Sequence, residues 1–188
     1  MKIVENYSEI PFAEPGDDCK LNANKKSRVK VVREFIGMNL STLHTLDIGA
    51  PNTFGQLLGI KDNTLRTDLH REMYAPSSEY DLILFSEIPE HIGNLLARFD
   101  DCYALLKPGG FLIVSTPIPN MIFYQSPHHL AEYRPDRLRK LMEYAGFEVV
   151  KYKKICIWDP LPFMFTGLRP FLRVLFHRSQ LWMMRKKP

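Results

Sequence analysis

Long hydrophobic runs are missing from this sequence of 188 residues. No stretch of about 18 uncharged apolar residues exists, so no transmembrane helix is predicted. Residues 1–6 also lack the apolar stretch and the small-residue cleavage site of a secretory signal peptide. We therefore expect a cytoplasmic protein.

Cysteine is also scarce. The three cysteines, Cys19, Cys102 and Cys156, are odd in number and widely spaced. This pattern gives neither a disulfide framework nor a zinc-binding spacing. No Gly-x-Gly-x-x-Gly motif opens a helix, as a nicotinamide-dependent oxidoreductase would require. We expect no metal site and no nicotinamide cofactor.

The composition is that of a folded protein, with 45% hydrophobic and 24% charged residues. A chain of this length can bury one full core, so a single domain is expected. Its predicted parts are an N-terminal arm (1–22), a helix (23–40), a core (41–155), an insertion (156–179) and a last strand (180–187).

Charge is distributed unevenly along the chain. From Lys151 onward nine Lys or Arg stand against one acid, Asp159, which gives +8 and leaves −4 for residues 1–150. A solvated basic face is the simplest interpretation. The alternatives are a surface that receives an acidic or phosphorylated small molecule, an anionic membrane face or an acidic partner.

The predicted insertion is rich in Phe, Leu, Pro and Arg between residues 159 and 177. This composition favours a short amphipathic helix that packs on the protein's own core, covers a site or contacts a membrane surface peripherally. Nucleic acid is not expected as a partner, because no basic stripe with interleaved aromatic residues is present elsewhere. The oligomeric state cannot be inferred from the sequence.

Strands and helices alternate along the chain, which is typical of a doubly wound α/β sheet. Apolar runs predict strands at 42–48, 80–85, 111–115, 148–155 and 180–185, and helical periodicity predicts helices at 24–38, 92–106 and 134–145. The stretch between Asp68 and Tyr80 holds only about eleven residues, fewer than the dozen or more that a crossover connection needs. The helix expected there is therefore shortened or missing.

Three segments carry a resemblance to a known family. They are Thr45–Gly49 (TLDIG), Ser86–His91 (SEIPEH) and Leu106–Pro117 (LKPGGFLIVSTP). In this order they resemble the first, fourth and fifth strands of class I methyltransferases that use S-adenosylmethionine. The resemblance implies a Rossmann-like, mostly parallel sheet with helices on both faces and an antiparallel last strand. It also implies methyl transfer from S-adenosylmethionine to a small-molecule acceptor.

The glycine-rich turn of that family is changed in this chain. The family pattern is approximately Asp-x-Gly-x-Gly-x-Gly, and here Asp47 and Gly49 are followed by Ala50, Pro51 and Asn52. Proline removes one N–H donor and fixes φ, so contacts with a ligand must differ from those of the family. We expect a functional variant of the loop in which these five residues bind the cofactor. The alternative is a noncatalytic methyltransferase-like scaffold that has lost cofactor binding.

Four further residues are predicted to bind the cofactor. A carboxylate at the end of the second strand commonly accepts hydrogen bonds from ribose hydroxyls, and both Asp62 and Asp68 are candidates for this role. Ser86 and Glu87 close a predicted strand at the edge of the sheet where ligands bind. The resemblance implies that Glu87 borders the methionine end of the cofactor.

Four residues are predicted on the acceptor side: His91, His128, His129 and Tyr133. The resemblance implies that His91 borders the acceptor. Histidine can remove a proton from an acceptor oxygen or nitrogen near neutral pH, and Tyr133 could orient the ring that does so. Positioning alone can supply much of the acceleration of a methyl displacement, so no catalytic base is required by the reaction.

Overall fold

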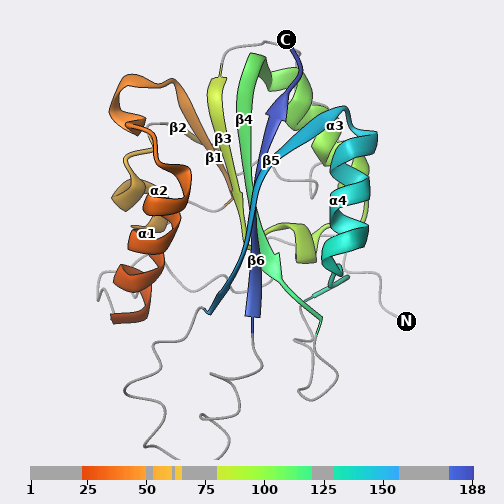
Figure 1. Cartoon of the computed structure of the whole chain (residues 1–188), viewed down its shortest axis with the longest axis horizontal. Helices are drawn as coiled ribbons and strands as arrows, with labels where there is room; N and C mark the ends of the chain where they lie inside the picture. The colour runs from red at the N-terminus through yellow and green to blue at the C-terminus, as the bar shows by residue number, and fades with distance from the viewer. Residues whose placement is uncertain (1–22, 50–52, 61, 65–79, 120–128, 157–177) are drawn as a thin grey trace, which may run out of the picture.

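The computed structural model describes residues 23–49, 53–60, 62–64, 80–119, 129–156 and 178–188. At its centre is a six-stranded sheet in the order β2-β1-β3-β4-β6-β5 (Figure 1). The strands are β1 (Thr45–Ile48), β2 (Asp62–Thr64), β3 (Tyr80–Ser86), β4 (Leu106–Pro117), β5 (Phe147–Cys156) and β6 (Arg178–Lys186). Strands β1 to β4 pair in parallel, whereas β6 is antiparallel to β4 and β5. The predicted mostly parallel sheet with an antiparallel last strand is confirmed.

Two pairs of helices cover opposite faces of this sheet (Figure 1). The helices are α1 (Ala23–Ile36), α2 (Thr53–Leu58), α3 (Leu95–Leu105) and α4 (Pro135–Tyr144), with short 3₁₀ turns η3 (Leu40–Thr42) and η4 (Pro89–His91). Helices α1 and α2 lie on one face, and α3 and α4 lie on the other. None of the described helices has the length and apolar character needed to span a membrane.

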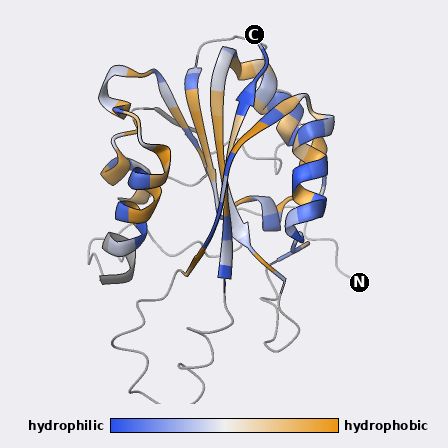
Figure 2. Cartoon of the chain, in the orientation of Figure 1, coloured by the Kyte–Doolittle hydropathy of each residue, from blue (hydrophilic) through white to orange (hydrophobic). Residues whose placement is uncertain are grey.

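The central strands consist largely of hydrophobic residues (Figure 2), and helices cover both faces of the sheet that they form. In β3, Leu82 and Leu84 pack with α1 and α2, whereas Ile83 and Phe85 pack with α3 and α4. All four side chains are at most 1% exposed. Alternate residues of a strand point to opposite faces, so one uninterrupted apolar run supplies two cores.

Two predicted helix boundaries differ from the structure. Helix α1 ends at Ile36 rather than Met38, since Gly37 has a φ of +67° and donates its N–H to the Arg33 carbonyl, as a C-terminal cap does. The helix predicted at 92–106 begins later in the structure: α3 starts only after Asn94, whose side chain accepts from the Ala97 N–H. Glu90 and His91 lie before it, in η4.

The carboxyl ends of the parallel strands meet at one edge of the sheet. In open α/β sheets, ligands bind outside this edge. Register pairs Ser86 of β3 with Ser115 of β4, and Asp47 of β1 with Leu84 of β3. The predicted compressed stretch between β2 and β3 lies outside the described residues, although β2 itself has only three residues.

Candidate functional site

Arg28 joins helix α1 to the carboxyl edge of the sheet. Its Nη2 atom donates to Ser86 Oγ at 3.0 Å and to Ser115 Oγ at 3.1 Å, and it lies 2.9 Å from Glu87 Oε1. Ser115 also donates to Glu87 Oε1 at 2.9 Å. The guanidinium lies 4.9 Å from the centre of the Phe54 ring of α2. One cation is therefore held among polar groups at the carboxyl ends of β3 and β4.

Glu87 adopts an unusual backbone conformation. Its φ is +56°, the one positive value for a non-glycine residue among those described. Its N–H donates to the Ser115 carbonyl at 2.7 Å. Such conformations are costly and occur where surrounding contacts impose them, often at functional sites. Here the turn directs the carboxylate of Glu87 toward Arg28.

Asp47 lies in β1, two residues before Gly49. Its side chain is buried, and burial raises its pKa to about 7. A Cβ atom added to Gly55 of α2 would overlap the Asp47 carboxylate, and one added to Gly49 would lie 2.9 Å from Ile88 Cδ1. Close packing therefore favours glycine at position 55, whereas at position 49 the φ of +142° favours it. Gly55 was not predicted as a site residue. The family pattern, counted from Asp47, expects glycines at positions 49, 51 and 53, and not at 55.

Other cofactor-side predictions are only partly described. Asp62 opens β2 and pairs with Leu46, so it precedes the carboxyl end of its strand rather than following it. Asp68 follows the end of β2 in the sequence but lies outside the described residues, as do Ala50, Pro51 and Asn52.

A second polar cluster lies beside the first, around Glu90. This side chain is 2% exposed, and its Oε2 atom accepts from Thr116 Oγ1 at 2.7 Å. Its carbonyl accepts from the N–H groups of Leu130 and Ala131, at 2.7 and 3.2 Å. Burial, followed by the negative charge of Glu87, raises the pKa of Glu90 to about 8. The backbone bonds tie the segment after β4 to η4.

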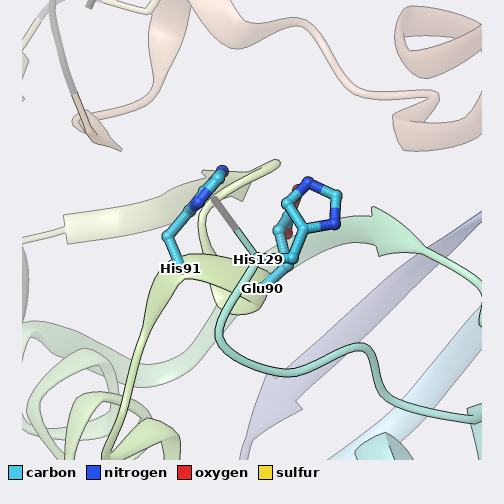
Figure 3. A group of neighbouring side chains, drawn as sticks. All are labelled: Glu90, His91 and His129. Carbon is cyan, nitrogen blue, oxygen red and sulfur yellow. The ribbon is translucent and has the colours of Figure 1, made fainter. Parts of the chain in front are cut away.

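His91 and His129 lie side by side over this acid (Figure 3). Their ring centres are 5.1 Å apart with an interplanar angle of 79°. His129 Nδ1 lies 2.7 Å from Glu132 Oε1. Because an ionised carboxylate only accepts, Nδ1 donates and Nε2 of His129 keeps its lone pair.

Tyr133 is not a hydrogen-bond partner of the His129 ring, and its expected role beside His128 lies outside the described residues. Among the described residues, the hydrogen-bond partner of the His129 ring is Glu132. Tyr133 packs against the core beside α3 and α4, and burial raises its pKa. Its carbonyl accepts from Gln180 of β6. His128 lies outside the described residues.

Of the predicted residues, the structure therefore brings Ser86 and Glu87 together in one cluster, and His91 and His129 together in another. Arg28, Ser115 and Glu132 were not predicted. His129 and Glu132 lie three residues apart, so closeness in the sequence could have pointed to this pair. Arg28 has no such signal, since it meets β3 and β4 only through the packing of α1.

The fold is shared with solved structures that include methyltransferases and a cyclase. A SAM-dependent methyltransferase from Archaeoglobus fulgidus superposes with a TM-score of 0.62 at 17% identity, over 86% of this chain and 94% of that one. The [4+2]-cyclase SpnF gives 0.61 at 12% identity, over 86% and 80%. The class defined by the fold is thus the Rossmann-like methyltransferase fold, which also carries a cyclase.

A family model described as a methyltransferase domain matches residues 22–152. The chain belongs to this methyltransferase-domain family. A "Ubiquinone biosynthesis O-methyltransferase" of Dinoroseobacter shibae is 33% identical over 105 residues, covering 47% of this chain and 42% of that protein. A "Probable S-adenosylmethionine-dependent methyltransferase" of Mycolicibacterium smegmatis is 32% identical over 85 residues, covering 42% and 32%. The match spans less than half the length of either relative.

Proposed function

We propose that this protein transfers a methyl group from S-adenosylmethionine to an oxygen of a small-molecule acceptor. Membership of the methyltransferase-domain family supports the reaction. The Dinoroseobacter relative is named as an O-methyltransferase, which supports oxygen as the acceptor atom. The observation that carries the proposal is the network of Arg28, Glu87 and Ser115 at the carboxyl edge of the sheet. Structural packing alone does not require a cation and an acid at that place.

The residues present fit the cofactor. Arg28 Nε is buried and has no hydrogen-bond partner among the described residues, so the guanidinium retains a donor for a carboxylate. Glu87 provides the opposite charge for an ammonium group. Gly49 allows close approach of backbone at the end of β1. When bound, S-adenosylmethionine supplies a methyl group activated by a sulfonium.

Cofactor binding is assigned to one connected region. Arg28 would hold the carboxylate, and Glu87 with Ser86 would hold the rest of the amino-acid part. Asp47 with Gly49 to Asn52 would form the turn beneath the cofactor. We assign the ribose hydroxyls to Asp68, because Asp62 begins its strand.

The acceptor side is assigned to the histidines. His129 Nε2 would accept the proton of an acceptor hydroxyl, while Glu132 holds Nδ1–H and so fixes the tautomer. His91 would border the acceptor from η4. We assign Tyr133 to support of this segment rather than to proton transfer, since it packs against the core. His128 remains a predicted neighbour.

A small acidic acceptor suits the basic C-terminal part of the chain. Lys153 and Lys154 of β5 are exposed, whereas Lys151 donates to the Phe35 carbonyl of α1. We retain an acidic or phosphorylated acceptor, peripheral membrane contact and a cytoplasmic location as predictions.

The test is calorimetric titration of the purified chain with S-adenosylhomocysteine, which lacks the reactive methyl. We expect binding in the micromolar range, and a loss of about tenfold or more in Arg28→Met because a charged hydrogen bond is removed. Arg139→Met is the matched control, because Arg139 pairs with Glu143 on the outside of α4. Its affinity should equal that of the wild type.

A folded wild type that binds neither S-adenosylhomocysteine nor S-adenosylmethionine would refute the proposal. That result would favour the alternative of a noncatalytic scaffold, which the altered turn after Gly49 would then explain. Equal affinity in Arg28→Met and wild type would refute the assignment of Arg28 alone.

A further inference from the structure

We infer that Glu90, His91 and His129 form a binding site for a divalent cation. Each of these residues offers one ligand atom, and the three atoms lie within 4.8 Å of one another (Figure 3). Ligands about 2.1 Å from a tetrahedral metal lie about 3.4 Å apart. Side-chain adjustments of about 1 Å would therefore bring the three atoms to coordination distance.

The backbone holds the two ligand-bearing segments together without a metal. Glu90 and His91 are neighbours in η4, and His129 comes from the segment after β4. The Glu90 carbonyl accepts from the N–H groups of Leu130 and Ala131, next to His129. The site is thus prepared by contacts between segments almost forty residues apart, which is why no ligand spacing is visible in the sequence.

The groups behind the ligands are those that metal ligands commonly have. A metal-bound histidine usually donates its other ring N–H to a carboxylate, and a ligating carboxylate is itself hydrogen-bonded. His129 Nδ1 lies 2.7 Å from Glu132 Oε1, and Thr116 donates to Glu90 Oε2 at 2.7 Å. His129 Nε2 and Glu90 Oε1 are then the atoms left for a cation.

The charge around Glu90 also favours a cation. Its side chain is only 2% exposed, and a second acid, Glu87, precedes it by three residues. The nearby guanidinium of Arg28 is already paired with Glu87. A buried charge is strongly unfavourable unless it is paired or bound to a metal.

Three protein ligands leave at least one coordination position open, as in catalytic metal sites. A hydroxyl oxygen of the acceptor could occupy it. The cation would lower the pKa of that hydroxyl, its proton would pass to solvent water, and this role would replace proton transfer to His129 Nε2. Acceptors with a second oxygen next to the hydroxyl would be favoured, since they can chelate. This role for the cation rests on the proposed function, whereas cation binding itself does not.

The test uses the full chain, freed of metal by a chelator and titrated with Co²⁺ and Zn²⁺. We expect one strong site per chain, with visible Co²⁺ absorption typical of nitrogen and oxygen ligands. His91→Ala, His129→Ala and Glu90→Gln should each weaken Zn²⁺ binding about tenfold or more, and Glu132→Gln by about 10- to 100-fold. His44→Asn is the control, because His44 lies beside Tyr80 before β1, at the opposite edge of the sheet.

Circular dichroism and thermal unfolding would establish that each variant folds. If Glu90→Gln does not, the two histidine variants decide. Absence of a strong site in the wild type, or unchanged affinity in both histidine variants, would overturn the inference. The cluster would then be a hydrogen-bonded polar group without a metal.

The two proposals fail separately. Binding of S-adenosylhomocysteine in the presence of chelator, without a strong Zn²⁺ site, would refute only the cation site. A strong Zn²⁺ site that depends on both histidines, without S-adenosylhomocysteine binding, would refute only the proposed methyl transfer.

Discussion

The pKa values of acidic side chains are shifted in opposite directions at the two edges of the sheet. At the amino edge, Asp81 lies 2.8 Å from Lys107 and accepts from the His44 N–H. These bonds hold the pKa of Asp81 below its usual range. At the carboxyl edge, burial raises the pKa of Asp47 and that of Glu90. An acid of the first kind stabilises the fold in its charged form, whereas acids of the second kind are held at a cost.

That contrast separates structural from functional groups. Strongly perturbed acids in a shared region are typical of functional sites, although ion-pair networks also perturb pKa values. At the amino edge, Asp81 is paired with Lys107 and with the His44 N–H. The carboxyl edge instead holds the buried acids Asp47 and Glu90. The pH dependence of stability should therefore have opposite signs at the two edges, and substitutions there should differ in the size of their effect.

The largest expected effect concerns the pH dependence of stability at Asp47. Its pKa rises from 3.8 to about 7 on folding. Between these values the unfolded chain ionises first, so the free energy of unfolding falls as pH rises and levels off above pH 7. The slope is about 1.4 kcal/mol per pH unit, or about 3 kcal/mol between pH 5 and 8.

Urea unfolding at pH 5 and pH 8 would measure this contribution in wild type and Asp47→Asn. The variant should lose this part of the pH dependence. Asp81→Asn is the control at the other edge, where the lowered pKa gives stability that is lost as pH falls. An unchanged slope in Asp47→Asn would show that burial of Asp47 carries no such cost.

A smaller effect is expected from a matched pair of glycines. Gly55→Ala would place a methyl group on the Asp47 carboxylate, whereas a Cβ at Gly93 meets nothing within 4 Å. We expect Gly55→Ala to lose about 2 kcal/mol of unfolding free energy despite its better helix propensity, and Gly93→Ala to change it by about 0.5 kcal/mol or less. Chemical denaturation would measure both. Equal stabilities would mean that the helix moves away from Asp47 freely.

The smallest effect is expected at the amino edge itself. Lys107→Met would remove the pairing of Asp81 with Lys107, whose side chains are 32% and 44% exposed. Exposed pairs contribute little, so we expect a loss of about 0.5 kcal/mol, reduced further by salt. Thermal unfolding at low and high ionic strength would test this. A loss comparable to that of Gly55→Ala would contradict the difference between the edges.

Much of the fold could be predicted from the sequence because its signals are local. The apolar runs at 80–85 and 111–115 place two neighbouring strands correctly, although β4 begins earlier than predicted, at Leu106. The predicted start of the helix at residue 92 was wrong. The apolar periodicity begins there, but the helix itself begins after the cap at Asn94. Where a short polar side chain decides the boundary, periodicity alone does not find it.

The site was predicted only where its residues lie in sequence motifs. Glu87 and His91 share one segment, so the resemblance selected both. Arg28 and Glu132 could not be selected in the same way, because long-range packing of α1 brings in the first and the path after β4 brings in the second. The proposed cation site combines both kinds of contact, and the sequence gives only half of it.

The antiparallel last strand has a consequence for biosynthesis. Strand β6 lies between β4 and β5, although β5 precedes it in the chain. As the chain leaves the ribosome, β5 therefore has no neighbouring strand to pair with until residues 178–186 have been made. Its pairing must wait for late, nonlocal contacts, which form slowly and leave hydrogen-bonding groups exposed meanwhile. Completion of the nascent sheet thus depends on the strand that is translated last among the six.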